Sequence, residues 1–72
     1  MTLGEERVRL SFNPGADSLV TEIKRATAAL IDLCDRHDGV AVTPEEQRLW
    51  ALAMTHYEDA AMWAVKAATT GK

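Results

Sequence analysis

The stretch from Trp50 to Thr69 constrains the fold of this chain more than any other. It contains neither glycine nor proline and is rich in alanine, the strongest helix former, so it predicts one long helix. Two sets of side chains recur in it at the three- and four-residue spacing of a helical face. The first set consists of Trp50, Met54, Tyr57, Ala61 and Val65, and the second of Leu52, His56, Asp59, Trp63 and Lys66. A helix in a simple hairpin needs one apolar stripe, so the second stripe indicates a further contact surface.

The start of this helix carries the clearest local signal in the sequence. Thr43 can serve as the N-cap, Pro44 fits the first helical position, and Glu46 can reach back toward the cap as the third residue. The pattern therefore predicts a helix from Pro44 to about Thr69, followed by Gly71.

Another helix is predicted before it. Asp17 or Ser18 can cap its start, and Gly39, which suits the left-handed position after a helix, predicts its end near Asp38. Its charged residues, Lys24 among them, are expected to lie mostly outside. The expected buried stripe consists of Leu19, Ile23, Ala26, Leu30 and either Leu33 or Cys34, with Val20, Thr27 and Ile31 beside it.

The N-terminal part is interpreted as an arm. Residues 7–12, RVRLSF, alternate polar and apolar side chains, which is typical of an extended segment, and residues 1–6 are expected to be loose. An isolated strand is not stable, so we expect the arm to lie on the helices of its own chain or of a neighbour; a partly ordered tail is the alternative. The predicted fold is all-α: an antiparallel two-helix hairpin over 15–72 with a short extended N-terminal arm over 1–14, assembled as an oligomer.

The length of 72 residues predicts one small domain near the limit of independent stability. No disulfide can form within one chain, because Cys34 is the only cysteine, and no spacing among Cys34, His37 and His56 resembles a metal site. Oligomerisation is therefore the expected source of additional stability. The lone cysteine also favours a reducing, cytosolic setting.

The net charge of −3 argues against a general DNA- or RNA-binding protein, which would show a basic patch. The acidic excess is concentrated in residues 32–46, so an anionic partner is expected to avoid this part of the chain. No apolar run approaches the roughly 20 residues of a membrane span, and the N-terminus lacks the apolar core of a signal peptide. We therefore expect no nucleic-acid partner and no membrane partner.

The ionisable residues do not form a recognisable catalytic group. His56 and Asp59 could touch at a spacing of three residues, but no nucleophile accompanies them, so we expect neither catalysis nor a cofactor. The predicted hairpin instead brings Lys24, Lys66 and Phe12 toward the end away from the acidic connection. There, phosphates could bind the cations and bases could stack on the aromatic ring. Spacing alone favours the simpler interpretation of solvent-exposed lysines and of aromatic side chains in core or subunit contacts.

Four segments resemble a known family. They are FNP at Phe12–Pro14, EIK at Glu22–Lys24, ALIDLC at Ala29–Cys34 and RLWALAMTHYEDAAMWAVKAAT at Arg48–Thr69. Together they look like the phage-encoded hairpin-domain family of cyclic-oligonucleotide sponges, which are small anti-defence proteins that counter the CBASS and Thoeris systems of bacteria. The resemblance covers nearly the whole chain from Phe12 onward. It rests on a pattern of residues and not on a catalytic motif.

The resemblance implies sequestration of an immune signal without cleavage, in the cytoplasm of the infected bacterial host. Members of the family assemble as oligomers, often hexamers, and bind cyclic dinucleotides, cyclic trinucleotides or cyclic ADP-ribose isomers between subunits. By position, Lys24 matches a phosphate-contacting lysine, and Phe12 matches an aromatic residue that stacks on a base, with Asn13 beside it as a ligand-binding residue. Lys66 matches a basic position of the second helix, and Thr55 matches a hydroxyl that lines a pocket. The chain departs from the pattern in being short and in lacking any extended β-domain before the hairpin.

Two functions are therefore open from the sequence. The first is a cyclic nucleotide sponge whose preferred ligand the resemblance does not assign. The second is a non-enzymatic helical protein–protein interaction module of a phage, in which the second apolar face of the long helix binds another protein. Binding of a cyclic nucleotide distinguishes the two, and recovery of the intact ligand after denaturation of the complex excludes an enzyme that hydrolyses the signal.

Overall fold

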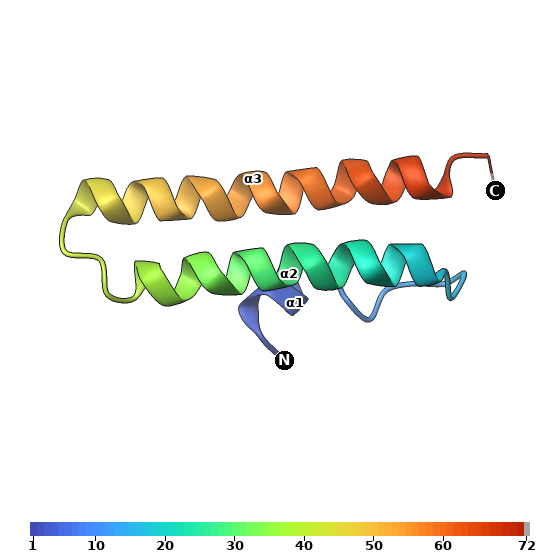
Figure 1. Cartoon of the computed structure of the whole chain (residues 1–72), viewed down its shortest axis with the longest axis horizontal. Coiled ribbons are helices and arrows are strands. Elements are labelled where there is room, and N and C mark those ends of the chain that lie inside the picture. The colour runs from blue at the N-terminus through green and yellow to red at the C-terminus, as the bar shows by residue number, and fades with distance from the viewer. Residues whose placement is uncertain (72) are drawn as a thin grey trace.

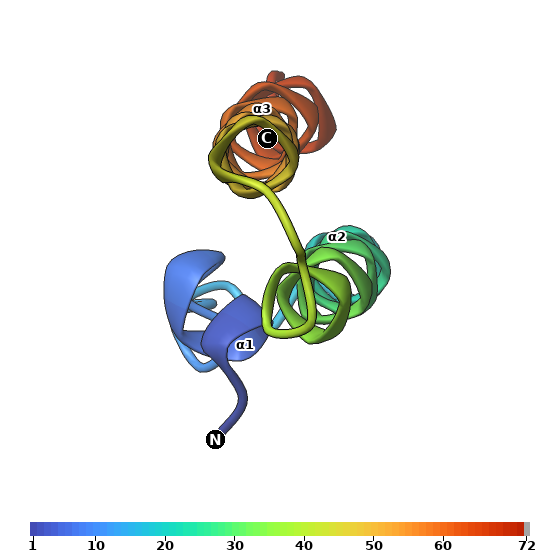
Figure 2. The ribbon, with the colours of Figure 1, turned by 90° about the vertical axis from the view of Figure 1, so that its left-hand side faces the viewer.

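The computed structural model describes residues 1–71, which form three α-helices and no strand. The helices are α1 (Leu3–Arg7), α2 (Ser18–Asp38) and α3 (Pro44–Thr69). Helices α2 and α3 lie side by side along a molecule 45 Å long and are joined at one end by a short connection (Figure 1). Seen along this axis, α1 and the segment after it lie on one side of α2, and α3 lies on another (Figure 2). The predicted all-α fold is confirmed.

Both long helices begin at predicted caps. The carboxylate of Asp17 accepts a hydrogen bond of 2.9 Å from the N–H of Leu19 at the start of α2. The hydroxyl of Thr43 accepts one of 3.1 Å from the N–H of Glu46 at the start of α3. Each cap satisfies an N–H group that has no partner within its helix, so the two helix starts follow directly from local sequence.

Helix α2 ends at the predicted residue but not in the predicted way. Gly39 has a φ of −63°, in the right-handed region that any residue adopts, so the expectation of a left-handed glycine is wrong here. The chain instead continues in tight turns, in which the N–H of Val40 bonds to the carbonyl of His37 (3.2 Å) and that of Ala41 to the carbonyl of Asp38 (3.1 Å). These turns satisfy the last carbonyl groups of α2 without a left-handed residue.

The extended N-terminal arm is wrong, because residues 1–12 contain helix α1 followed by a turn. The hydroxyl of Thr2 accepts a hydrogen bond of 3.1 Å from the N–H of Glu5, and the Glu5 carboxylate accepts one of 2.9 Å from the N–H of Thr2. This reciprocal pair is a capping box, which starts a helix. It outweighs the alternation of residues 7–12, which is too short to specify a strand. The division into an arm (1–14) and a hairpin domain (15–72) stays a prediction.

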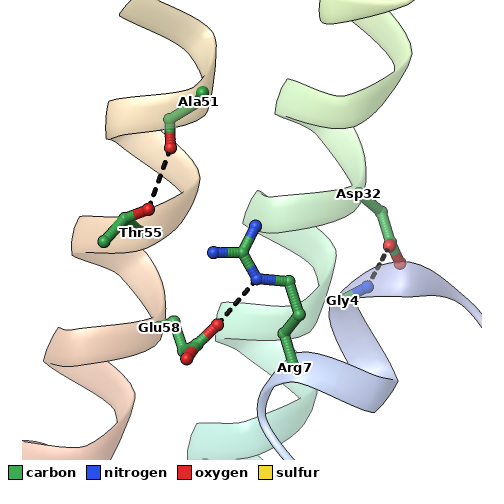
Figure 3. Close-up of polar contacts among 6 residues, drawn as sticks. All are labelled: Gly4, Arg7, Asp32, Ala51, Thr55 and Glu58. Carbon is green, nitrogen blue, oxygen red and sulfur yellow. Dashed lines mark hydrogen bonds and ion pairs between the residues drawn. The ribbon is translucent and has the colours of Figure 1, made fainter.

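Helix α1 is attached to both long helices (Figure 3). The N–H of Gly4 donates to Asp32 Oδ1 of α2 over 2.7 Å, and Arg7 Nε donates to Glu58 Oε1 of α3 over 2.6 Å. The first contact brings two backbones together, because a Cβ on Gly4 would lie 2.1 Å from the carbonyl oxygen of Ala28. Only a glycine fits this approach.

The core is a layer between α2 and α3 that is closed on one side by the residues after α1. Its buried members are Val8, Ala28, Ile31, Cys34, Met54 and Ala61, and Leu10, Trp50, Ala53 and Tyr57 pack against them. The predicted inner face of α3 is confirmed, because Met54 is 5% exposed and Trp63 on the second stripe is 61% exposed. Near the connection, the Trp50 indole stacks on His37 with 5.3 Å between ring centroids.

The predicted buried stripe of α2 is largely wrong. Leu19, Leu30 and Leu33 are 46%, 39% and 42% exposed. The buried residues of α2 are Val20, Lys24, Ala28, Ile31 and Cys34. The helix has apolar side chains on two neighbouring faces, so its periodicity does not choose between them. The docking of α1 does, because Gly4 lies against the backbone of α2 at Ala28 and bonds to Asp32, and that rotation turns the three leucines outward.

Candidate ligand-binding site

Lys24 is the centre of the candidate site, and its surroundings differ from the prediction that it lies outside. Its side chain in α2 is only 6% exposed. The ammonium group donates to the backbone carbonyl of Arg9 (2.9 Å) and to that of Phe12, and lies 5.6 Å from the centroid of the Phe12 ring. Burial lowers the pKa of Lys24, and the positive charge of nearby Arg9 lowers this pKa further.

The two carbonyls that Lys24 contacts belong to a tight turn after α1. Arg9 has a φ of 55°, in the left-handed region that residues with a side chain seldom adopt. The N–H of Leu10 donates to the carbonyl of Glu5 (3.0 Å), and the N–H of Phe12 donates to the carbonyl of Arg9 (2.9 Å). The Arg9 carbonyl therefore accepts from both Phe12 and Lys24, and the turn is closed against α2.

Asn13 connects the same segment to the start of α2. Its Nδ2 donates to the carbonyl of Asp17 (2.8 Å) and to Thr21 Oγ1 (2.9 Å), and its Oδ1 accepts from the N–H of Asp17 (3.1 Å). These bonds occupy both ends of the amide. In this structure Asn13 therefore holds the Phe12 backbone in place, and its amide is not free.

Two adjoining pockets flank Lys24. One, of about 470 Å³, is lined by Phe12, Asn13 and Lys24 together with Val65 of α3. The other, of about 460 Å³, is lined by Arg7, Arg9, Lys24, Glu58, Met62 and Val65. Both volumes lie within the range of ligand sites, about 300–1,000 Å³. The structure thus brings together three of the five predicted site residues, with the Phe12 ring 61% exposed at the first pocket.

The other two predicted site residues lie elsewhere on α3 and line neither pocket. Thr55 is exposed, and its hydroxyl donates to the carbonyl of Ala51 over 3.2 Å (Figure 3). Lys66 is also exposed, and its ammonium lies 5.2 Å from the centroid of the Trp63 ring. Within one chain, these two side chains do not join the group around Lys24.

The charges around the second pocket favour an anion. Its lining contains three cations, Arg7, Arg9 and Lys24, and one carboxylate, Glu58, which is already paired with Arg7. Of the ion pairs in residues 1–71, none includes Arg9 or Lys24. The second pocket is therefore electropositive on a chain with a net charge of −3. No group of three or more His, Cys, Asp and Glu side chains in the described part could hold a metal ion.

Comparison with known proteins places this geometry in a family. The family model described as Acb2/Tad1, hairpin domain, matches residues 4–69. The chain belongs to this family. The Acb2/Tad1 hairpin domains are those of the anti-CBASS and anti-Thoeris sponges, so the resemblance found in the sequence is confirmed. Membership implies, in general terms, an anti-defence protein that binds cyclic nucleotides as a sponge and not as a catalyst.

The match to the Acb2/Tad1 hairpin domain reaches from Gly4 to Thr69 and so includes most of α1 as well as both long helices. No curated protein and no solved structure matches the chain. None of the helices in the described residues is long and apolar enough to cross a membrane.

Sequence reasoning missed Arg9 as a candidate. The position of Arg9 beside the Lys24 ammonium depends on a left-handed backbone conformation. The sequence does not indicate this conformation, because the residue is neither glycine nor asparagine. The one available signal was the capping box of Thr2 and Glu5, which starts a short helix and so places Arg9 in the turn that follows it. Recognising that box would have brought Arg9 near α2.

Proposed function

We propose that this Acb2/Tad1 hairpin protein is a phage anti-defence sponge that binds a cyclic oligonucleotide or a cyclic ADP-ribose-type signal and holds it without cleaving it. It would act in the cytoplasm of the infected bacterium. The observation that supports this best is the convergence of the exposed Phe12 ring with the cations Lys24 and Arg9 at two adjoining pockets of an otherwise acidic chain.

The chemistry of the lining suits a ligand that combines bases and phosphates. Stacking of a base on an aromatic ring contributes about 1–3 kcal/mol, and the Phe12 ring is exposed enough to accept one. A charge-assisted contact to a phosphate contributes about 1.5–3 kcal/mol. Of the two carboxylates in the lining, Glu58 is bound to Arg7 and Asp17 caps the start of α2, so both are already engaged and neither is placed as a general base. Binding without cleavage is what such a lining supports.

We also propose that the antiparallel hairpins assemble as a homo-oligomer, with a hexamer as the expected state. The support is a large set of exposed apolar side chains on both long helices: Leu19, Leu30, Leu33, Leu49, Leu52, Met62 and Trp63. Full burial of one such side chain contributes about 1.5–3 kcal/mol. Assembly would also give Thr55 and Lys66 a role, because residues that line no pocket in one chain can complete a pocket with a neighbour.

The same exposed surface favours one alternative, a helical module that binds another phage or host protein. Calorimetric titration against cyclic dinucleotides, cyclic trinucleotides and cyclic ADP-ribose isomers separates the two functions. The sponge function predicts saturable binding of at least one compound with a defined stoichiometry. Binding of none of them would refute the sponge and favour the module.

Cleavage is tested on the same complex. The protein is incubated with its ligand for hours and then denatured by heat, and the released compound is analysed by chromatography. The sponge predicts full recovery of intact ligand. Recovery of a linear or hydrolysed product would instead show an enzyme.

A further inference from the structure

We propose that Lys24 is a positioning residue, and that Arg9 supplies the cation that contacts a ligand phosphate. Lys24 holds the segment from Arg9 to Phe12 against α2, so that the Arg9 guanidinium and the Phe12 ring are presented at the pockets together. This inference rests on the proposed function, since it concerns how the same site recognises its anion. It reassigns the role that the family resemblance gives to Lys24.

The hydrogen bonds of Lys24 support a positioning role. An ammonium group has three hydrogens to donate, and two of them go to the carbonyls of Arg9 and Phe12. With the side chain only 6% exposed, little of the group is left for a ligand. The two bonds to the turn leave one hydrogen over, and a phosphate that replaced either of them would release the turn from α2.

The backbone of Arg9 gives the reason that such a clamp is needed. A residue with a side chain is disfavoured at a φ of 55° and keeps this conformation only where the surroundings hold it. The Lys24 ammonium bonds to the carbonyl of Arg9 itself and to that of Phe12, three residues later. The clamp therefore spans the strained residue and the aromatic residue of the candidate site.

The side chain of Arg9 is suited to the anion contact. Arg9 is exposed, lines the pocket next to Lys24, and forms no ion pair with a carboxylate among residues 1–71. By contrast, the nearby Arg7 guanidinium is bound to Glu58. A guanidinium offers several donors in a plane and binds a phosphate through two hydrogen bonds at once. Arg9 is therefore the exposed, unpaired cation at this site.

The first test examines the free protein and needs no ligand. Amide hydrogen exchange is measured by NMR for Lys24→Met, Arg9→Gln and the control Arg25→Gln, which removes the same charge from an exposed position of α2. Lys24→Met should speed exchange of the Phe12 amide, which donates to the Arg9 carbonyl, by about tenfold or more. Core amides around Ile31 should change less than about twofold. Unchanged exchange at Phe12 in Lys24→Met, or equal acceleration throughout the core, would overturn the clamp.

The second test is calorimetric titration with cyclic di-adenylate, cyclic tri-adenylate and cyclic ADP-ribose. Arg9→Gln should weaken binding about ten- to a hundredfold, as expected for loss of a charged contact, without altering exchange in the free protein. Lys24→Met should weaken binding at least as much, because it releases the Phe12 ring as well as Arg9. Adding Arg9→Gln to it should weaken binding no further, because the Arg9 contact is already lost. Arg25→Gln should stay within about twofold of the unchanged protein.

Three results would contradict the inference. Arg9→Gln binding as tightly as the unchanged protein would remove the Arg9 contact. Multiplicative losses in the double variant would show that Lys24 contacts the ligand by itself. If the unchanged protein bound none of the three compounds, the proposed function and the Arg9 contact would fall together, whereas the exchange measurement would still decide whether Lys24 clamps the turn.

Discussion

Replacing Gly4 by alanine should detach α1 from α2 while leaving the two long helices packed. The added Cβ would lie 2.1 Å from the carbonyl oxygen of Ala28 and 2.8 Å from Asp32 Oδ1. The Ala28 carbonyl belongs to the backbone of α2 and cannot turn away, so α1 must move by about 1 Å or more to reach ordinary van der Waals separation. Such a shift breaks the 2.7 Å hydrogen bond from the Gly4 N–H to Asp32.

The size of the effect follows from what α1 loses. A hydrogen bond to a charged acceptor contributes about 1.5–3 kcal/mol. Partial exposure of Val8, which is 7% exposed when α1 is docked, costs about 1–2 kcal/mol more. The better helix propensity of alanine than of glycine offsets up to about 1 kcal/mol of this loss. The expected net loss is therefore about 2–4 kcal/mol of docking free energy, confined to α1 and the turn after it.

Amide hydrogen exchange and thermal unfolding measure this loss. Gly15→Ala is the matched control, because its Cβ would meet nothing within 4 Å. In Gly4→Ala, residues 3–12 should lose protection and the α2–α3 core should keep its own; Gly15→Ala should change neither. If the two variants behaved alike in both measurements, the close approach of α1 would not hold the N-terminal segment in solution.

Three further outcomes are expected. Trp50→Ala should cost about 2–3 kcal/mol of folding stability, because the Trp50 ring packs on the core. Trp63→Ala, which removes a ring that is 61% exposed, should leave helix content nearly intact by circular dichroism and reduce the oligomer seen by light scattering. Equal loss of helix in both variants would contradict the face assignment. Glu58→Gln should cost less than about 1 kcal/mol, because the pair with Arg7 is partly exposed, and should tighten binding of an anionic ligand by calorimetry; weaker binding would refute it. Burial lowers the pKa of Lys24, so the folded protein releases this proton at a lower pH than the unfolded chain does. Folding stability should therefore rise as pH increases from that lowered pKa toward the usual 10.5. Denaturant titrations of Lys24→Met should lack this rise.

The fold could be predicted from sequence wherever a local signal decided it. The caps at Asp17 and Thr43 satisfy free N–H groups with their own side chains, so these helix starts needed no knowledge of the rest of the chain. The inner face of α3 was also predictable, because its two stripes differ in composition and only one lacks charge. These features depend on contacts within a few residues.

The rotation of α2 could not be predicted in the same way. The leucines of α2 form one apolar face and its smaller buried residues form another, and the sequence pattern placed the leucines in the core. The deciding contact lies far away in sequence, where Gly4 approaches Ala28. The burial of Lys24 could not be predicted from the sequence either, because an ammonium group is buried only where carbonyl groups accept its hydrogen bonds. Both outcomes are set by the N-terminal segment, which the alternation of residues 7–12 had indicated to be extended.

This rotation connects the candidate site with the outer apolar face. Lys24 and Ala28 lie one helical turn apart, so the rotation that turns Ala28 toward Gly4 also turns Lys24 toward the N-terminal segment. Leu30 and Leu33 lie on the other side of α2 and are exposed by the same rotation. Had the leucines been inside, Lys24 would face solvent, and no clamp would hold Arg9 in its left-handed turn. One close backbone contact therefore accounts both for the order of the candidate site and for the outward position of these leucines.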